Sequence, residues 1–236
     1  MVAVVFGTSG GLGAELARQL VARRPGPVFG VSRRAAPPID GVSPLHADVT
    51  DGEALAGVAQ AVTSSGAVEL VIIATGLLSE GDTLQPEKTY KHQSLEAFER
   101  VFAANTFGPA LVAKHLLPTM PRKGRAVFAA LSARVGSISD NRMGGWHAYR
   151  ASKAALNMLI RNYAVEVGRR NADFIAVGLH PGTVDTNLSK PFQGNVPDKK
   201  LFTPNYSAGA LLDVIDDLTP ENTGNVYDFN GKLVPA

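Results

Sequence analysis

Short, continuous apolar runs alternate with longer stretches of helical periodicity along most of the chain. Such runs are typical of parallel strands buried on both faces, and the stretches between them place apolar residues on one helix face. The pattern predicts strands at residues 2–6, 28–32, 45–50, 69–74, 125–131, 174–179 and 226–229, with helices between them at about 13–23, 51–64, 94–117, 151–167 and 204–218. This alternation predicts a doubly wound parallel sheet flanked by helices, in a single α/β domain over residues 1–236.

Two stretches depart from the simple pattern. The helix predicted over 94–117 contains Asn105 and Gly108, which both lower helix propensity. A kink, a ligand contact or a plain defect would each account for them. Residues 187–204 contain several prolines and glycines without a clear period, and such a loop is typical of a substrate lid.

The candidate functional residues follow strand ends. They occur at 7–13, 32–34, 75–76, 132 and 180–186. Ligands of open parallel sheets bind beyond the carboxyl ends of the strands, so these segments are expected to meet at one edge of the sheet.

A glycine-rich turn follows the first strand and reads Gly7-Thr8-Ser9-Gly10-Gly11-Leu12-Gly13. Glycines permit a tight turn and let backbone N–H groups approach a pyrophosphate at a helix N-terminus. The order of strand, glycine-rich turn and helix therefore predicts a Rossmann-like dinucleotide site, although the spacing differs from G-x-G-x-x-G. The alternative is a glycine-rich turn without a ligand.

Arginines follow the second strand, where a site for NAD usually carries an acid. The chain reads Ser32-Arg33-Arg34 there, with no acid before Asp40. Guanidinium groups suit a 2′-phosphate, which favours NADP(H) over NAD(H). The alternative is a pair of solvated arginines. Asp48 is placed to bond an adenine amine. Alternatively, Asp48 or Thr50 caps the next helix, and both roles could hold at once.

Tyr149 and Lys153 stand four residues apart, on one face of a predicted helix. A phenol normally titrates near pH ~10, and a nearby ammonium lowers that pKa toward the range useful for proton transfer. The positive end of the helix dipole also favours the phenolate. The plain alternative is a surface Tyr and Lys on an ordinary helix.

Composition excludes several functional classes. The 236 residues include no cysteine, so disulfides and thiol catalysis are excluded, and no apolar run is long enough to span a membrane. Met1 leads directly into an apolar strand, which predicts no signal peptide and a cytoplasmic location. The formal net charge is +2 with scattered basic residues, so no nucleic acid partner is expected. No metal site is expected, since no second His or acid accompanies His180 at ligand spacing.

With the glycine-rich turn, Asn105, Ser132, Tyr149 and Lys153 in this order, the chain resembles the short-chain dehydrogenase/reductases over nearly its whole length. Within them it is similar to the C-factor and sniffer carbonyl reductase branch, through Ser132–Ile138, Gly144-Gly145-Trp146 and Tyr149–Asn157.

The resemblance implies a role for each matching residue. Tyr149 is the expected general acid/base, and Lys153 lowers its pKa and bonds the nicotinamide ribose. Asn105 holds a water in a proton relay, and Ser132 binds the substrate carbonyl oxygen. Pro181, Gly182 and Thr183 contact the nicotinamide, and Thr186 contacts its carboxamide side or the diphosphate. The expected dinucleotide-binding set comprises Gly7, Ser9, Gly11, Leu12, Gly13, Ser32, Arg33, Arg34, Asp48, Val49, Ala74, Thr75, Gly76, Asn105, Tyr149, Lys153, Pro181, Gly182, Thr183, Val184 and Thr186.

Three positions depart from the family pattern. Ala74-Thr75-Gly76 replaces Asn-Ala-Gly, and the glycine motif begins differently. The third departure affects the serine, because counting back from Gly136 places Ala133 where the family has its catalytic serine. Neighbouring strand residues point to opposite faces, so Ser132 is the choice only if the backbone bends locally, and Ser137 is the alternative.

The sequence therefore predicts an NADP(H)-dependent oxidoreductase acting on a small carbonyl or alcohol substrate. Two rival hypotheses are a catalytically silent or signalling protein that keeps the dinucleotide, and a module of this fold that binds none. The resemblance implies a homodimer or homotetramer through the helices of Asn105 and Tyr149. Apolar residues that could line a substrate pocket, or equally belong to the core or a subunit contact, are Leu77, Leu78, Val135, Trp146, Phe192 and Phe202.

Overall fold

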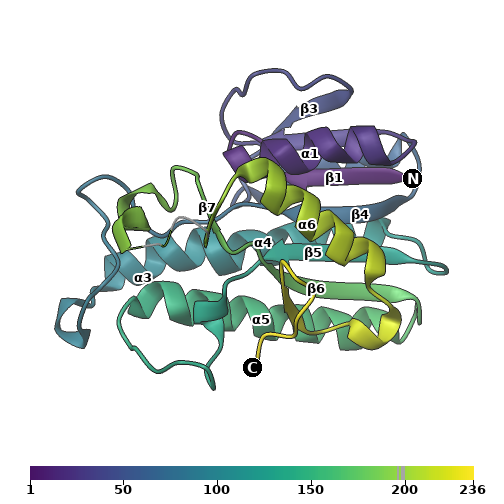
Figure 1. Cartoon of the computed structure of the whole chain (residues 1–236). Coiled ribbons are helices and arrows are strands. Elements are labelled where there is room, and N and C mark those ends of the chain that lie inside the picture. The colour runs from purple at the N-terminus through teal and green to yellow at the C-terminus, as the bar shows by residue number, and fades with distance from the viewer. Residues whose placement is uncertain (196, 198–199) are drawn as a thin grey trace.

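The fold is built on a seven-stranded, wholly parallel sheet in a computed structural model that describes residues 1–195, 197 and 200–236. The strand order is β3-β2-β1-β4-β5-β6-β9 (Figure 1). The strands are β1 (Val2–Phe6), β2 (Val28–Ser32), β3 (Val42–His46), β4 (Val68–Ile73), β5 (Ala126–Leu131), β6 (Phe174–His180) and β9 (Val226–Asp228). The order reverses on either side of β1, so the doubly wound parallel sheet predicted from the sequence is confirmed.

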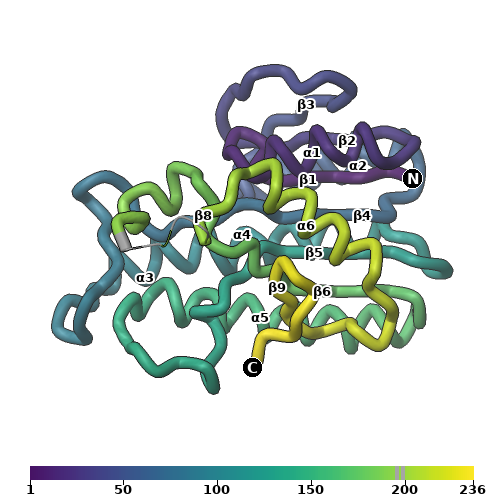
Figure 2. The backbone as a smooth tube through the Cα atoms, viewed as in Figure 1, coloured from purple at the N-terminus to yellow at the C-terminus, as the bar shows by residue number. Residues whose placement is uncertain are grey.

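Helices cover both faces of the sheet (Figure 2). Helices α1 (Gly11–Arg23) and α6 (Pro204–Asp217) pack on one face through Leu16, Leu20 and Leu211. Helices α2 (Gly52–Thr63), α4 (Gly108–Leu116) and α5 (His147–Gly168) pack on the other through Leu55, Leu116 and others. Because the central strands are apolar on both faces, nearly all of their residues enter one of these two cores.

The segment predicted as one helix over 94–117 is divided in the structure. It consists of α3 (Leu95–Phe102), a π-helical segment η2 (Ala103–Phe107) and α4. A π segment is a frequent feature of functional sites, and it brings Asn105 to a fully buried position. The disturbance that Asn105 and Gly108 indicate in the sequence corresponds to this π-helical segment.

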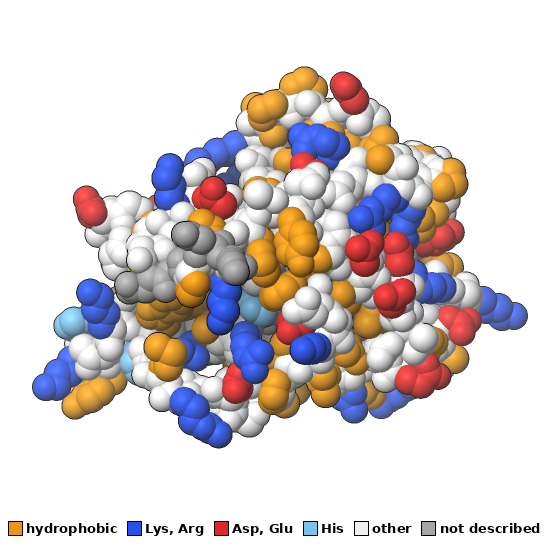
Figure 3. All heavy atoms as spheres, in the orientation of Figure 1, with side chains coloured by type: hydrophobic (Ala, Val, Ile, Leu, Met, Phe, Trp, Pro, Cys, Tyr) orange, Lys and Arg blue, Asp and Glu red, His pale blue; other side chains and the backbone are white. Residues whose placement is uncertain are grey.

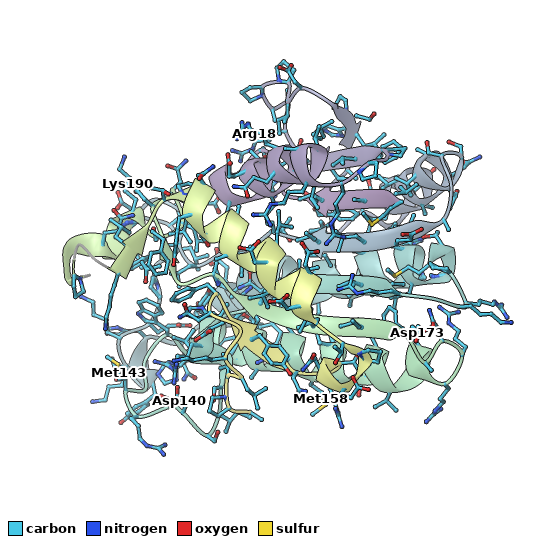
Figure 4. The ribbon with its side chains drawn as sticks, turned by 45° about the vertical axis from the view of Figure 1, so that its right-hand side comes forward. Arg18, Asp140, Met143, Met158, Asp173 and Lys190 are labelled. Carbon is cyan, nitrogen blue, oxygen red and sulfur yellow. The ribbon has the colours of Figure 1, made fainter. Side chains whose placement is uncertain are left out.

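Short elements gather beyond the carboxyl ends of the strands. They are η1 (Tyr90–His92), η4 (Arg134–Gly136), η5 (Lys190–Asn195) and the small parallel pair of β7 (Thr183–Val184) with β8 (Leu201–Phe202). Figure 4 shows Asp140 and Met143 at the same end of the molecule as Lys190, opposite Asp173. Residues 196, 198 and 199 of the predicted lid lie outside the described residues.

The surface carries mixed charge. Figure 3 shows Lys and Arg side chains interspersed with Asp and Glu over one face of the molecule. Within the described ranges, no helix is long and apolar enough to cross a membrane.

Candidate active site

The glycine-rich turn lies at the centre of the sheet edge, in contact with two other predicted segments. A Cβ on Gly7 would stand 2.9 Å from the Ala74 carbonyl carbon, so β1 and the 74–76 turn approach closely. A Cβ on Gly11 would stand 3.4 Å from Thr186 Cγ2. The structure therefore brings together three strand-end segments that are far apart in the sequence.

The turn itself has the geometry of an anion site. Gly7 has a φ of 92°, and a Cβ on Gly13 would collide with the Gly7 carbonyl oxygen. Gly10 begins α1 without a side-chain cap, and the first turn of the helix contains no acid. Free backbone N–H groups at a helix N-terminus bind phosphate groups, so this turn fits the pyrophosphate of a dinucleotide.

Ser32, Arg33 and Asp48 lie together at the ends of β2 and β3. The Ser32 hydroxyl donates to the Arg34 carbonyl oxygen at 2.7 Å, and Arg33 Nη1 lies 3.5 Å from Asp48 Oδ2. The Arg33 side chain remains 63% exposed and can reach a ligand phosphate. Burial would raise the pKa of Asp48, but hydrogen bonds from the Thr50 N–H and hydroxyl, with Arg33 nearby, hold it below its ordinary value.

Neither Asp48 nor Thr50 caps helix α2. The N-cap is Asp51, whose carboxylate accepts from the N–H groups of Glu53 and Ala54 at 3.0 Å. Val49 packs against α4, where a Cβ on Gly108 would lie 2.5 Å from Val49 Cγ2. This close packing explains the glycine inside the helix.

Asn105 is tied to the segment that follows β4. Its Oδ1 accepts from the Leu77 N–H and its Nδ2 donates to the Leu77 carbonyl oxygen, both at 2.8 Å. Its Nδ2 also donates to Ser152 Oγ at 3.1 Å, on helix α5. These bonds link the π segment to α5 one residue before Lys153.

Tyr149 and Lys153 lie in the first two turns of α5, with 8% and 3% of their surfaces exposed. Lys153 Nζ lies 5.8 Å from the centre of the Tyr149 ring and donates to the Leu131 carbonyl oxygen at 2.7 Å. A Cβ on Gly76 would stand 3.6 Å from Asn105 Oδ1 and 3.9 Å from Lys153 Nζ. Tyr149, Lys153 and Asn105 therefore meet beside Gly76, close to the glycine-rich turn.

Burial controls the proton affinities of this pair. It raises the pKa of Tyr149 to about 12 and lowers the pKa of Lys153 to about 8, since each charged form is disfavoured away from water. Desolvation is the cause of the raised Tyr149 pKa in this structure, and the lowering of this pKa by Lys153 stays a prediction from the sequence.

Ser132 does not take the position expected of it. It is buried, and its hydroxyl donates to Asn157 Oδ1 at 2.6 Å, eight residues and about 12 Å along α5 from Tyr149. Ala133 instead packs in the apolar cluster that contains Tyr149. Ser137 is buried as well, with its hydroxyl accepting from the Asp140 N–H. The Ser132 hydroxyl is therefore engaged by Asn157, and Ala133 is the neighbour of Tyr149 in the apolar cluster.

The loop after β6 is held against the rest of the site. The Ser207 hydroxyl donates to the Pro181 carbonyl oxygen at 2.9 Å, and Gly182 has a φ of 77° where a Cβ would collide with Phe202. Thr183 and Val184 pair with β8. Thr186 lies opposite Gly11, so this loop and the glycine-rich turn form adjacent walls.

Two buried polar atoms near the site have no hydrogen-bond partner among the described residues. They are Thr75 Oγ1, after β4, and His180 Nδ1, at the end of β6. Burial lowers the pKa of His180 to about 4, so the imidazole is neutral at physiological pH. Buried polar atoms are normally satisfied, so these two are exceptions among the described residues.

An apolar cluster surrounds Tyr149. It includes five of the six residues predicted for a substrate pocket: Leu77, Leu78, Val135, Trp146 and Phe192. Phe202 packs instead on Phe229, with ring centres 4.6 Å apart. A groove of about 770 Å³ lies elsewhere, between α1, α6 and β9, and holds none of the predicted site residues.

Glu87 is a site residue that the sequence did not reveal. It is 4% exposed, and both of its carboxylate oxygens accept from the Ala148 N–H at 3.3 Å, at the start of α5. It lies in the 78–93 loop, which shows no period and no motif. A helix cap that comes from 61 residues away has no local sequence signal.

Known proteins resemble this chain in sequence and in fold. Residues 1–196 match the family model described as short chain dehydrogenase. The C-signal of Myxococcus xanthus is 38% identical over 136 residues, which cover 58% of this chain and 76% of that protein.

Solved structures share the fold. NADPH-bound carbonyl reductase from chicken fatty liver superposes with a TM-score of 0.84, at 24% identity, covering 100% of this chain and 98% of the other. The carbonyl reductase Sniffer of D. melanogaster gives a TM-score of 0.82 at 21% identity, with the same coverage. With the family model matching most of the chain and Tyr149, Lys153 and Asn105 meeting beside the glycine-rich turn, the protein belongs to the short-chain dehydrogenase family.

Proposed function

We propose that the protein is an NADP(H)-dependent oxidoreductase that interconverts a carbonyl compound and its alcohol. The observation that carries the proposal is the meeting of Tyr149, Lys153 and Asn105 at Gly76, next to a helix N-terminus suited to a pyrophosphate. The NADPH-bound carbonyl reductase with the same fold supports this cofactor.

The dinucleotide-binding residues form a continuous strip along the carboxyl edge of the sheet. Backbone N–H groups around Ser9 and Leu12 bind the pyrophosphate, and Arg33 and Arg34 bind the 2′-phosphate. Asp48 and Val49 flank the adenine site, and Ala74 and Thr75 line the centre of the strip. The 181–186 loop and Lys153 would hold the nicotinamide end.

Bound dinucleotide supplies or accepts the hydride at the substrate carbon. During reduction, Tyr149 Oη donates a proton to the carbonyl oxygen, and during oxidation it takes the proton back. The Lys153 ammonium stabilises the phenolate left after donation. Asn105 fixes the turn after β4 through Leu77 and so positions Gly76 beside the ammonium.

We propose that the substrate oxygen is bound by Tyr149 without help from Ser132, because the Ser132 hydroxyl is bonded to Asn157. Copies of the protein associate through the helices of Asn105 and Tyr149. Exposed apolar side chains on these helices support this mode of association, since Phe107 and Met158 are 55% and 62% exposed. The cytoplasmic location stays a prediction from the sequence.

A non-catalytic, dinucleotide-binding signalling protein is the second candidate function. It is favoured by Ala133 beside Tyr149, where no hydroxyl is available, and by the similarity to C-signal. Buried Tyr149, Lys153 and Asn105 favour the enzyme, because two buried ionisable groups without catalytic use are expensive to maintain.

Titration of the purified protein with NADPH and with NADH, followed by nicotinamide fluorescence, tests the cofactor. We expect tighter binding of NADPH than of NADH. Arg33→Ala should raise the Kd for NADPH by about tenfold and change the Kd for NADH by less than about twofold. Arg169→Ala, at the far end of α5, is the matched control. Equal losses for the two dinucleotides would show that Arg33 does not contact the phosphate.

Turnover separates the two candidate functions. With NADPH and a panel of aldehydes, ketones and quinones, Tyr149→Phe should lower kcat by about 10²–10⁴-fold and leave the Kd for NADPH nearly unchanged. Tight NADPH binding without reduction of any carbonyl would favour the signalling protein.

A further inference from the structure

Trp146 has an unusual backbone conformation. It is the non-glycine residue with a positive φ among the described residues, at 52°, and it follows Gly144 and Gly145 at 63° and 67°. Left-handed backbone is unfavourable for a bulky residue and persists only where the surroundings enforce it. Residues with such backbone conformations concentrate at functional sites.

Two residues, Glu87 and Arg150, hold the turn that carries Trp146 through hydrogen bonds. The Glu87 carbonyl oxygen accepts from the Trp146 N–H at 2.5 Å, while the Glu87 carboxylate caps α5 at Ala148. Arg150 Nε donates to the Gly145 carbonyl oxygen at 3.0 Å, and its Nη1 donates to the Val135 carbonyl oxygen at 3.3 Å. Glu87 and Arg150 therefore fix both the backbone of Trp146 and its distance from the loop after β5.

The braced indole forms an aromatic wall beside Tyr149. Its ring centre lies 6.2 Å from that of Tyr149 at an interplanar angle of 76°, and 5.3 Å from that of Phe192 at 57°. The other neighbours in this cluster, Leu77, Leu78 and Val135 among them, are apolar. A substrate whose oxygen reaches Tyr149 would therefore place part of its carbon skeleton against the indole and these apolar side chains.

We propose that Trp146 is a specificity-determining residue that selects planar, apolar carbonyl compounds, such as aromatic aldehydes and ketones. The inference rests on the oxidoreductase function proposed above. Aromatic rings gain from offset or edge-to-face contact with an indole beyond the gain from burial.

Benzaldehyde and cyclohexanecarbaldehyde make a matched test, because they have similar size and differ in planarity. With NADPH, the wild type should favour benzaldehyde in kcat/KM by about tenfold, the ratio that one good aromatic contact supplies. Trp146→Leu should remove most of this preference, and Trp146→Phe should retain it. Tyr90→Ala, which removes a 69% exposed aromatic ring, is the control. A preference that survives in Trp146→Leu would overturn the proposal.

Fluorescence provides a readout that does not depend on turnover. The chain contains one tryptophan, so its emission reports on Trp146 alone. In the presence of NADP⁺, benzaldehyde should quench this emission saturably, and cyclohexanecarbaldehyde should do so much less. Absence of saturable quenching would overturn the proposal. Saturable quenching by a protein that reduces neither aldehyde would keep the proposed pocket and overturn the oxidoreductase function.

Discussion

Ser132 and Ala133 are neighbours in sequence with opposite surroundings. Ser132 Oγ is bonded to Asn157 on α5, whereas Ala133 packs in the cluster of Tyr149. Sequence reasoning identified the one-residue offset, but it did not predict the hydrogen bond from Ser132 to Asn157. The Ser132–Asn157 bond instead joins the end of β5 to the middle of α5.

Replacing Ser132 by Ala should therefore affect stability rather than chemistry. The change leaves the Asn157 amide oxygen without its buried donor, which costs about 1 kcal/mol of unfolding free energy, while kcat stays within about twofold. Urea denaturation and steady-state kinetics measure the two effects. Ser43→Ala, at an exposed position in β3, is the control. A hundredfold loss of kcat with unchanged stability would return Ser132 to the catalytic set.

Lys153 makes stability depend on pH. Its folded-state pKa of about 8 lies below the ordinary value of 10.5, so between these values the unfolded chain binds more protons and stability rises with pH. The penalty for burying the ammonium is fully present below pH ~8 and is relieved as the pH rises.

Lys153→Met removes that pH dependence. The wild type should gain about 2 kcal/mol relative to the variant between pH 7 and pH 9.5, because about 1.5 pH units lie above the folded pKa in this window. Urea denaturation of both proteins at the two pH values measures the gain. Lys114→Met, on the exposed face of α4, controls for the loss of a lysine side chain. A constant difference between wild type and Lys153→Met would show that Lys153 is not desolvated.

At the scale of the element, the segment from α3 to α4 shows how a side chain can dictate helix geometry. The π turn directs Asn105 inward, where it occupies both backbone groups of Leu77 and the hydroxyl of Ser152. The low helix propensity of Asn105 and Gly108 indicated from the sequence that the helix is disturbed at this position. It did not identify the partners, because they lie in a turn and a helix remote in sequence.

Asn105→Ala should destabilise the protein by about 3 kcal/mol, because the N–H and carbonyl groups of Leu77 and the buried Ser152 hydroxyl would all lose the fully buried Asn105 amide as a partner. The midpoint of chemical denaturation measures the loss. Asn230→Ala, in an exposed turn after β9, should change the midpoint little. A loss as small as that of the control would mean that water replaces the amide.

The other elements differ in how well their limits could be predicted. The limits of the central strands agree with the prediction to within one residue, because a strand buried on both faces is a continuous apolar run. The edge strand β3 covers Val42–His46 rather than 45–50, because it is half exposed and carries no such run. Helix α5 begins at His147, four residues before the predicted 151, since its cap is the distant Glu87.

At the scale of the molecule, the convergence of the site was predictable and its fine geometry was not. Parallel topology alone places the segments after β1, β4, β5 and β6 at one sheet edge. The direction of Ser132 and the cap by Glu87 depend on tertiary contacts that a single sequence does not encode locally. The single-domain organisation stays a prediction from the sequence.

The two outer strands of the sheet are poor templates for further pairing. Pro44 interrupts β3 and has no N–H to offer, which is tolerated only on an edge. At the other side, β9 has three residues, and residues 232–234 already occupy its backbone, with Val234 N–H donating to the Val226 carbonyl oxygen at 2.8 Å. Exposed strand edges are the usual starting points of fibrillar aggregation. This chain therefore resists growth of its sheet from copy to copy.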